Sequence, residues 1–269
     1  TMLMEQIKRI KDLMFIKEQD EQQELSSYMD STYLKTPEQA GIGEEETDVI
    51  VFDTIQDAIE HNIKLVMLRP EYVEAARKFI DSKGANVLVG TVIGFPHGDS
   101  EHGVKMDEAL EAIENGVDEL DFVVDYKAFK SGNLDKVMKE VAEGTDIGID
   151  EGKTVKWIIE SAALSPEEIA ELTRLISKIV VEVVGQEKAR NVFVKTSTGF
   201  YKPESGGHGG ATTEDVSIMS QNAGPLQVKA SGGIYSKDDL QKMLDAGATR
   251  IGTSAAKEII LDKETDTNY

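Results

Sequence analysis

Short apolar runs rich in β-branched residues recur along this chain at a nearly constant interval. Successive runs begin about 22–37 residues apart, which is the length of a strand, a loop and a helix in one βα unit. The eight runs are Tyr28–Leu34, Lys64–Leu68, Asn86–Ile93, Glu119–Val124, Thr154–Ile159, Asn191–Thr196, Leu226–Ala230 and Arg250–Gly252. Because each run is nearly continuously apolar, the pattern favours a parallel sheet covered by helices.

The segments between these runs carry helix signals. Pro70–Ser82 and Val104–Asn115 place apolar side chains at helical spacing. Ser165, Thr212 and Ser236 each precede acidic residues, which is typical of a helix N-terminus. Strands that alternate in this way with helices predict a (β/α)8 barrel of the TIM type, an α/β fold.

We predict one domain over residues 1–269, with an extra N-terminal helix at about residues 3–19 and a polar C-terminal tail at about residues 262–269. The N-terminal helix is expected to cover the bottom of the barrel. An open, doubly wound sheet fits less well, because a glycine-rich turn usually follows its first strand. The first run here ends in Asp30-Ser-Thr-Tyr-Leu-Lys, without such a turn.

Composition excludes several classes of protein. With 29 basic and 50 acidic residues the net charge is −21, which opposes binding to nucleic acid or to an anionic membrane. The absence of cysteine excludes disulfides, a thiol nucleophile and thiolate metal sites. No apolar stretch is long enough for a transmembrane helix, and no signal-peptide pattern opens the chain, so we expect a cytoplasmic protein. A homo-oligomer is compatible with these features.

Two lysines stand at the ends of apolar runs, where lysine is rarely found unless it is paired or functional. Lys195 ends Asn191-Val-Phe-Val-Lys, and Lys229 ends Leu226-Gln-Val-Lys. A free lysine, with a pKa of about 10.4, is protonated at neutral pH, but burial and a neighbouring cation can lower the value to about 7–8. The free amine can then attack a carbonyl and form an imine, as an aldolase without a metal requires.

Carboxylates follow the same strands. Asp30, Asp121 and Glu160 lie at or near strand ends that would open into the same barrel mouth as the two lysines. A buried ion-pair network that only stabilises the core is the alternative interpretation. Three acids and two lysines that converge from separate strands favour a functional site.

Several motifs resemble those of one enzyme family in the same order, from about Tyr28 to Ile260. They are Gly94-Phe-Pro-His-Gly98, Asp118-Glu-Leu-Asp-Phe-Val-Val124, Phe193-Val-Lys-Thr-Ser-Thr-Gly-Phe200, Gly209-Gly-Ala-Thr-Thr-Glu-Asp-Val216, Lys229-Ala-Ser-Gly-Gly-Ile and Arg250-Ile-Gly-Thr-Ser254. The chain thus resembles the deoxyribose-phosphate aldolases, which are class I, Schiff-base aldolases.

The resemblance implies a lyase that cleaves 2-deoxy-D-ribose 5-phosphate to D-glyceraldehyde 3-phosphate and acetaldehyde, without a cofactor. It assigns the imine to Lys195, the lowering of that lysine's pKa to Lys229, and the proton relay to Asp121. Asp30 occupies the position of a strand-1 aspartate of the family and is expected in the polar network of the site.

A phosphate site is expected in the loops after the seventh and eighth strands, the usual place in this fold. Glycines there let backbone N–H groups approach an anion. The candidate residues are Gly232, Gly233, Gly252 and Ser254, with Thr198 and Gly199 at the same end. Taken alone, each glycine pair could be a simple turn.

The chain departs from the family pattern in three places. Val66-Met67-Leu68 lacks the cysteine that the family often has in its second strand. Gly41–Thr47 and Tyr201–Gly206 look like insertions in loops. Tyr269 ends the chain, as a catalytic tyrosine does in some members, although a disordered terminus is the simpler interpretation.

Other functions stay open at this point. A metal-dependent aldolase could use His97 and His102 with nearby carboxylates, but it would leave the two strand lysines without a role, so we predict no metal. Another Schiff-base aldolase or a transaldolase would act on a different sugar phosphate. A non-catalytic phosphate-binding barrel would share the fold alone. An acidic protein-interaction module would not need buried lysines.

Overall fold

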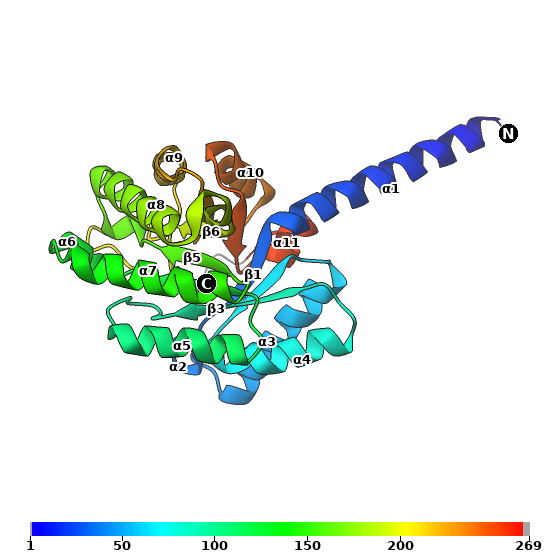
Figure 1. Cartoon of the computed structure of the whole chain (residues 1–269). Helices are drawn as coiled ribbons and strands as arrows, with labels where there is room; N and C mark the ends of the chain where they lie inside the picture. The colour runs from blue at the N-terminus through cyan, green and yellow to red at the C-terminus, as the bar shows by residue number, and fades with distance from the viewer. Residues whose placement is uncertain (1, 266–269) are drawn as a thin grey trace.

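The computed structural model describes residues 2–265 and places its strands in a closed parallel barrel, ordered β1 to β8 around the ring (Figure 1). The strands are β1 (Met29–Tyr33), β2 (Leu65–Leu68), β3 (Leu88–Ile93), β4 (Glu119–Val123), β5 (Thr154–Ile158), β6 (Val192–Lys195), β7 (Gln227–Ser231) and β8 (Arg250–Thr253). The predicted (β/α)8 barrel is therefore confirmed, and every predicted run agrees with a strand to within two residues.

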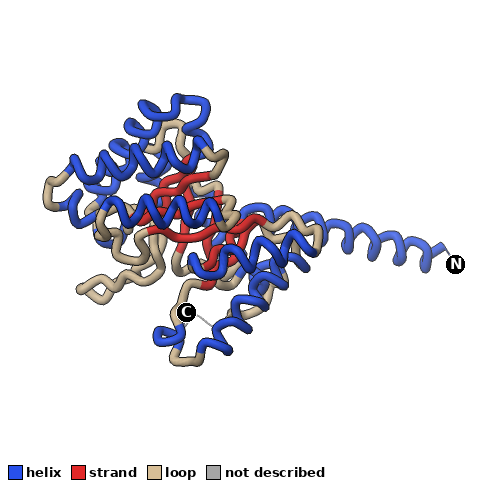
Figure 2. The backbone as a smooth tube through the Cα atoms, turned by 60° about the horizontal axis from the view of Figure 1, so that its bottom comes forward, coloured by secondary structure: helices blue, strands red, loops and turns tan. Residues whose placement is uncertain are grey.

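Helices surround the strands, so that the sheet lies inside a helical layer (Figure 2). The α-helices are α1 (Met2–Tyr28), α2 (Pro37–Ala40), α3 (Glu44–Glu60), α4 (Val73–Ser82), α5 (His102–Glu114), α6 (Tyr126–Lys130), α7 (Leu134–Asp150), α8 (Pro166–Lys188), α9 (Thr213–Asn222), α10 (Lys237–Ala246) and α11 (Ala256–Ile260). Short 3₁₀ turns cover Pro70–Tyr72, Ser161–Ala163 and Ala189–Asn191.

The predicted helix starts are confirmed by their caps. The Ser165 hydroxyl accepts a hydrogen bond from the backbone of Glu168, whose side chain accepts one from the backbone of Ser165. The side-chain oxygens of Thr212 and Ser236 cap α9 and α10 by accepting from the backbone N–H groups of Asp215 and Asp239. Such caps satisfy N–H groups that a helix start leaves without partners. The caps therefore fix the residue at which each of these helices begins.

The hydrophobic core lies between the strands and the helices, outside the barrel ring. Outward-facing side chains such as Leu120, Phe122 and Trp157 are fully buried there. The rings of Phe122 and Trp157 stack with centroids 4.6 Å apart. Because side chains alternate along a strand, this apolar outer layer leaves the inward positions free for polar residues.

The prediction that the N-terminal helix covers the bottom of the barrel is wrong. A helix is present as predicted, but α1 is longer than residues 3–19 and projects away from the barrel (Figure 1). Every residue from 2 to 21 is exposed, and α1 is anchored at its C-terminal end, where the Ser26 hydroxyl donates to the carbonyl of His61. The barrel floor is polar, with Lys64 and Gln227 among its residues, so it offers little to an apolar helix face.

The two expected insertions differ in kind. Gly41–Thr47 is mostly not a loop, because its glutamates form the first turn of α3, where acidic side chains favour the helix dipole. Tyr201–Gly206 lies in a segment without regular secondary structure, as expected. Tyr269 lies outside the described residues. Among residues 2–265 no helix is long and apolar enough to span a membrane.

Candidate active site

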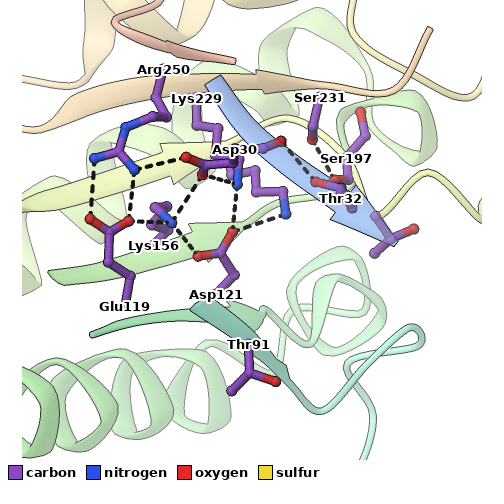
Figure 3. Close-up of polar contacts among 12 residues, drawn as sticks. Asp30, Thr32, Thr91, Glu119, Asp121, Lys156, Ser197, Lys229, Ser231 and Arg250 are labelled. Atoms are coloured by element: carbon purple, nitrogen blue, oxygen red, sulfur yellow. Dashed lines mark hydrogen bonds and ion pairs between the residues drawn. The ribbon is translucent and has the colours of Figure 1, made fainter. Parts of the chain in front are cut away.

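Five charged side chains from five strands converge inside the barrel, and Figure 3 labels Asp30, Asp121, Lys156 and Lys229 among them. They are Asp30 on β1, Asp121 on β4, Lys156 on β5, Lys195 on β6 and Lys229 on β7. All five are buried. Charges at such depth require partners, and here each lysine nitrogen contacts at least one carboxylate.

Asp121 joins the two lysines that the sequence singles out. Lys195 and Lys229 are register partners on neighbouring strands, so their side chains leave the sheet on the same side. The Nζ atoms of both lie 3.0 Å from Oδ2 of Asp121. Lys229 also donates to Asp30 Oδ2 at 2.6 Å. The structure thus brings together all three residues predicted to be catalytic, with Asp30 beside them.

The pKa of Lys195 is lowered to about 8. Burial is the largest cause, because it disfavours the ammonium form, and the positive charge of Lys229 acts in the same direction. Asp121 opposes both effects but does not cancel them. A substantial fraction of Lys195 is therefore a free amine near neutral pH, which is the form that attacks a carbonyl.

Asp121 is ionised in this environment. Burial alone would raise the pKa of its carboxyl group, but the ammonium groups of Lys156, Lys229 and Lys195 hold it well below the usual range. The carboxylate therefore stays charged beside the Lys195 amine and accepts hydrogen bonds from the three lysine nitrogens.

A second layer of charge lies below this group, toward the barrel floor, and the sequence analysis missed it. Lys156 Nζ contacts Asp121 Oδ1 at 2.7 Å and Glu119 Oε2 at 2.8 Å. Arg250 bridges Glu119 and Asp30, with Nη1 2.7 and 3.0 Å from their oxygens (Figure 3). A lysine within the apolar run Thr154–Ile159 is the same signal that identifies Lys195, and it could have identified Lys156.

The predicted phosphate residues share one pocket at the carboxyl ends of β6, β7 and β8. Its lining includes Lys195 and all six residues predicted for the phosphate site, namely Thr198, Gly199, Gly232, Gly233, Gly252 and Ser254. Gly232 and Gly233 both have positive φ, at 85° and 77°, a conformation that suits glycine. Asp30 does not line this pocket, since its carboxylate lies beneath it against Lys229 and Arg250.

Glu160, which the sequence placed near the barrel mouth, shapes the pocket wall. Its backbone is left-handed, with φ 54°, and its buried carboxylate accepts hydrogen bonds from the backbone N–H and the hydroxyl of Thr198 at 3.2 and 2.7 Å. Burial raises its pKa to about 7, although the bonds from Thr198 and the charge of Lys195 act against the shift. Glu160 therefore titrates near neutral pH beside the pocket.

The segment that contains the Tyr201–Gly206 insertion ends against the same pocket. A Cβ atom at Gly233 would lie 2.2 Å from Nε2 of His208, so the imidazole occupies the space that a side chain at residue 233 would need. The other ring nitrogen, Nδ1, accepts from the backbone N–H of Gly210 at 3.2 Å.

The histidines considered for a metal site lie apart from this centre. His97 is exposed, and Nε2 of His102 is 2.6 Å from Oε2 of Glu143 on α7. Over residues 2–265 no group of three or more His, Cys, Asp or Glu side chains is arranged to hold a metal ion.

Comparisons with known proteins agree with this geometry. The sequence profile described as DeoC/LacD family aldolase matches residues 25–257. The chain is 41% identical over 245 residues to the deoxyribose-phosphate aldolase of Staphylococcus haemolyticus strain JCSC1435, which covers 91% of this chain and 99% of the relative. It is 39% identical over 244 residues to deoxyribose-phosphate aldolase 1 of Staphylococcus aureus strain MRSA252, covering 90% and 98%.

A solved structure shows the same barrel. The deoxyribose phosphate aldolase from Aeropyrum pernix, described as a unique tetramer, superposes with a TM-score of 0.72 at 28% identity, and the match covers 90% of this chain and 91% of that one. The profile match over most of the chain and the identity to curated relatives agree with the fold. The chain belongs to the DeoC/LacD family of aldolases.

Proposed function

We propose that this aldolase cleaves 2-deoxy-D-ribose 5-phosphate to D-glyceraldehyde 3-phosphate and acetaldehyde, through an imine on Lys195. The observation that carries the proposal is the position of Lys195, which lines the glycine-rich pocket and whose amine lies 3.0 Å from Asp121. The substrate is that of the named relatives, which share about two fifths of their residues with this chain.

In the first step the Lys195 amine attacks C1 of the open-chain sugar, and loss of water leaves an iminium ion. Lys229 favours the free amine before attack, because its positive charge stands beside Lys195. The ionised Asp121 accepts from both lysine nitrogens and is placed to take up and return protons during carbinolamine formation and dehydration.

In the second step the C3 hydroxyl loses its proton, through a water held by Asp121 and Lys229, and the C2–C3 bond breaks. The oxygen forms the aldehyde of D-glyceraldehyde 3-phosphate, and the bonding electrons move to C2 and the iminium nitrogen to give an enamine. Protonation of C2 and hydrolysis of the resulting iminium ion release acetaldehyde and restore the amine. The positive nitrogen is the electron sink, so no metal is required.

The phosphate of the substrate would lie among the backbone N–H groups of Gly232, Gly233 and Gly252, with the Ser254 hydroxyl as a further donor. Neutral donors suit this chain, because they bind an anion locally despite the net charge of −21. Lys156, Glu119 and Arg250 lie below the pocket and support the catalytic layer without touching substrate.

Imine trapping tests the proposal. The protein is incubated with acetaldehyde and reduced with borohydride, and the adduct is mapped by peptide mass spectrometry. We expect an ethyl group on Lys195, no specific adduct in Lys195→Ala, and slower labelling in Lys229→Ala. Labelling scattered over surface lysines would contradict the Schiff-base assignment. A specific adduct without cleavage of 2-deoxyribose 5-phosphate would keep the imine and contradict only the substrate.

A further inference from the structure

The exposed half of α1 has no role in the pocket and lies outside the family match, which begins at residue 25. It nevertheless carries a row of apolar side chains, Leu3, Ile7, Ile10 and Met14, all exposed. Their spacing of four, three and four residues places them on one face of the helix, as in the seam of a coiled coil. A helix gains most of its stability by packing such a face, so this one requires a partner.

We propose that the partner is α1 of a second copy of this chain, paired antiparallel. The spacing of the row reads the same in both directions. A two-fold axis between Ile7 and Ile10 therefore sets Leu3 against Met14 of the other copy, and Ile7 against Ile10. Every apolar side chain of the row meets an apolar partner, which is the self-complementarity that a two-fold interface needs.

The charge distribution selects this segment as the place of contact. Residues 2–17 hold four basic and two acidic side chains, a net charge of +2, whereas the whole chain carries −21. Two copies repel each other much more strongly through their acidic barrels than through these segments, which carry only +2 each. Lys11 lies next to the row, and in the antiparallel pair it adjoins Met4 of the other copy, so no like charges meet along the seam.

The acidic segment that follows selects the antiparallel direction. Glu18, Asp20, Glu21 and Glu24 give residues 18–24 a charge of −4 without a basic residue. Parallel helices would bring two such segments and two acidic barrels side by side. In the antiparallel pair the two segments lie on opposite sides of the axis, and the barrels begin about 50 Å apart at 1.5 Å per residue.

Sedimentation analysis of the full chain tests the pairing. We expect the mass of the parent to be twice that of Ile7→Gln/Ile10→Gln, whose dissociation constant should rise by more than about 100-fold, because four buried isoleucines are lost per pair. The matched control is Phe15→Gln/Ile16→Gln, which removes two exposed apolar side chains outside the row and should keep the mass of the parent. Both variants should retain aldolase turnover, since α1 contributes nothing to the pocket.

Three outcomes would overturn the proposal. The parent and the row variant could have equal masses, or the control could dissociate as readily as the row variant. A parent that is monomeric in solution and sediments with phosphatidylglycerol vesicles would assign the row to a lipid surface instead.

Disulfide mapping tests the direction of pairing. Because the chain has no cysteine, only the introduced cysteines can cross-link. An oxidised mixture of Leu3→Cys and Met14→Cys chains should form the mixed dimer, whereas Leu3→Cys alone should not cross-link. Efficient cross-linking of Leu3→Cys with itself would mean a parallel pair and would contradict the antiparallel arrangement.

Discussion

Lys195 and Lys229 share one acceptor atom, because their nitrogens both lie 3.0 Å from Oδ2 of Asp121. Two ammonium groups on one oxygen repel each other, which favours the loss of a proton from one of the two lysines. Lys195 is the one that lines the pocket, whereas Lys229 has a second carboxylate, Asp30, to hold its proton. Lys195 is thus both the lysine with the lowered pKa and the one that the pocket reaches, so both observations select it as the nucleophile.

Activity should follow the ionisation of Lys195. The amine reacts only without its proton, and its pKa is about 8. We therefore expect kcat/KM to rise with pH, to reach half its maximum near pH 8 and to level off above that. Replacing Lys229 with Met removes a cation, which raises the pKa of Lys195. We expect activity at pH 7.5 to fall about 10–100-fold, since each pKa unit costs tenfold in free amine. Full pH profiles of both proteins measure the shift.

Lys156→Met is the matched control for this substitution. Its nitrogen also contacts Asp121, but Lys156 does not line the pocket. The variant should therefore lose stability, by about 3–5 kcal/mol, because it leaves carboxylates without a partner. The rising part of its kcat/KM profile against pH should shift less than that of Lys229→Met. A loss in Lys229→Met that is the same at every pH would contradict the electrostatic role of Lys229.

Asp121→Asn should separate imine formation from cleavage. The amide is nearly the same size but cannot take up a proton, so kcat for cleavage should fall by about 10²–10⁴. The pKa of Lys195 should fall further, because the carboxylate that favours its ammonium form is gone. Borohydride trapping of acetaldehyde on Lys195 should slow, because Asp121 also serves carbinolamine formation and dehydration, but labelling of Lys195 should still be reached on longer incubation. Complete loss of labelling even on long incubation would contradict this separation of imine formation from cleavage.

The sequence predicted the barrel because one physical signal repeats. Each strand is buried on both faces, so it must be apolar along its outer side, and the helix signals between strands are local. The reactive residues followed for the same reason, since Lys195 and Lys229 interrupt apolar runs. Long-range partners leave no such local mark. Lys105 lies on α5 within a helical pattern, yet its nitrogen is buried 2.6 Å from Glu140 on α7.

The direction in which α1 leaves the barrel could not be predicted from local sequence patterns either. Its periodicity predicts a helix with an apolar face, but it does not say what that face contacts. The prediction assumed that the barrel floor would accept it. Whether the floor is apolar depends on the residues around the N-terminal ends of eight strands, and here Lys64 and Arg250 are among those that line it.

Adding one methyl group at Gly233 should weaken substrate binding in the phosphate pocket. Gly233→Ala strains a residue with φ 77° and places Cβ 2.2 Å from His208 Nε2, so the loop must move. We expect KM for 2-deoxyribose 5-phosphate to rise at least about tenfold, while turnover of unphosphorylated deoxyribose changes little. Gly132→Ala is the control, since its φ is 83° but nothing lies within 4 Å. It should lose comparable stability and keep KM.

Glu160 should make the protein less stable as pH rises through the weakly acidic range. Its carboxyl pKa is raised from 4.5 to about 7, so between these values the folded state binds a proton that the unfolded state has lost. Stability from this group is full below about pH 4.5 and is lost as pH approaches 7, by about 3 kcal/mol in total. Glu160→Gln cannot titrate, so urea unfolding from pH 4.5 to 7.5 should show the difference between parent and variant. A constant difference across this range would mean that the carboxyl group is ionised throughout, and that Thr198 is held by a charge rather than by a titrating acid.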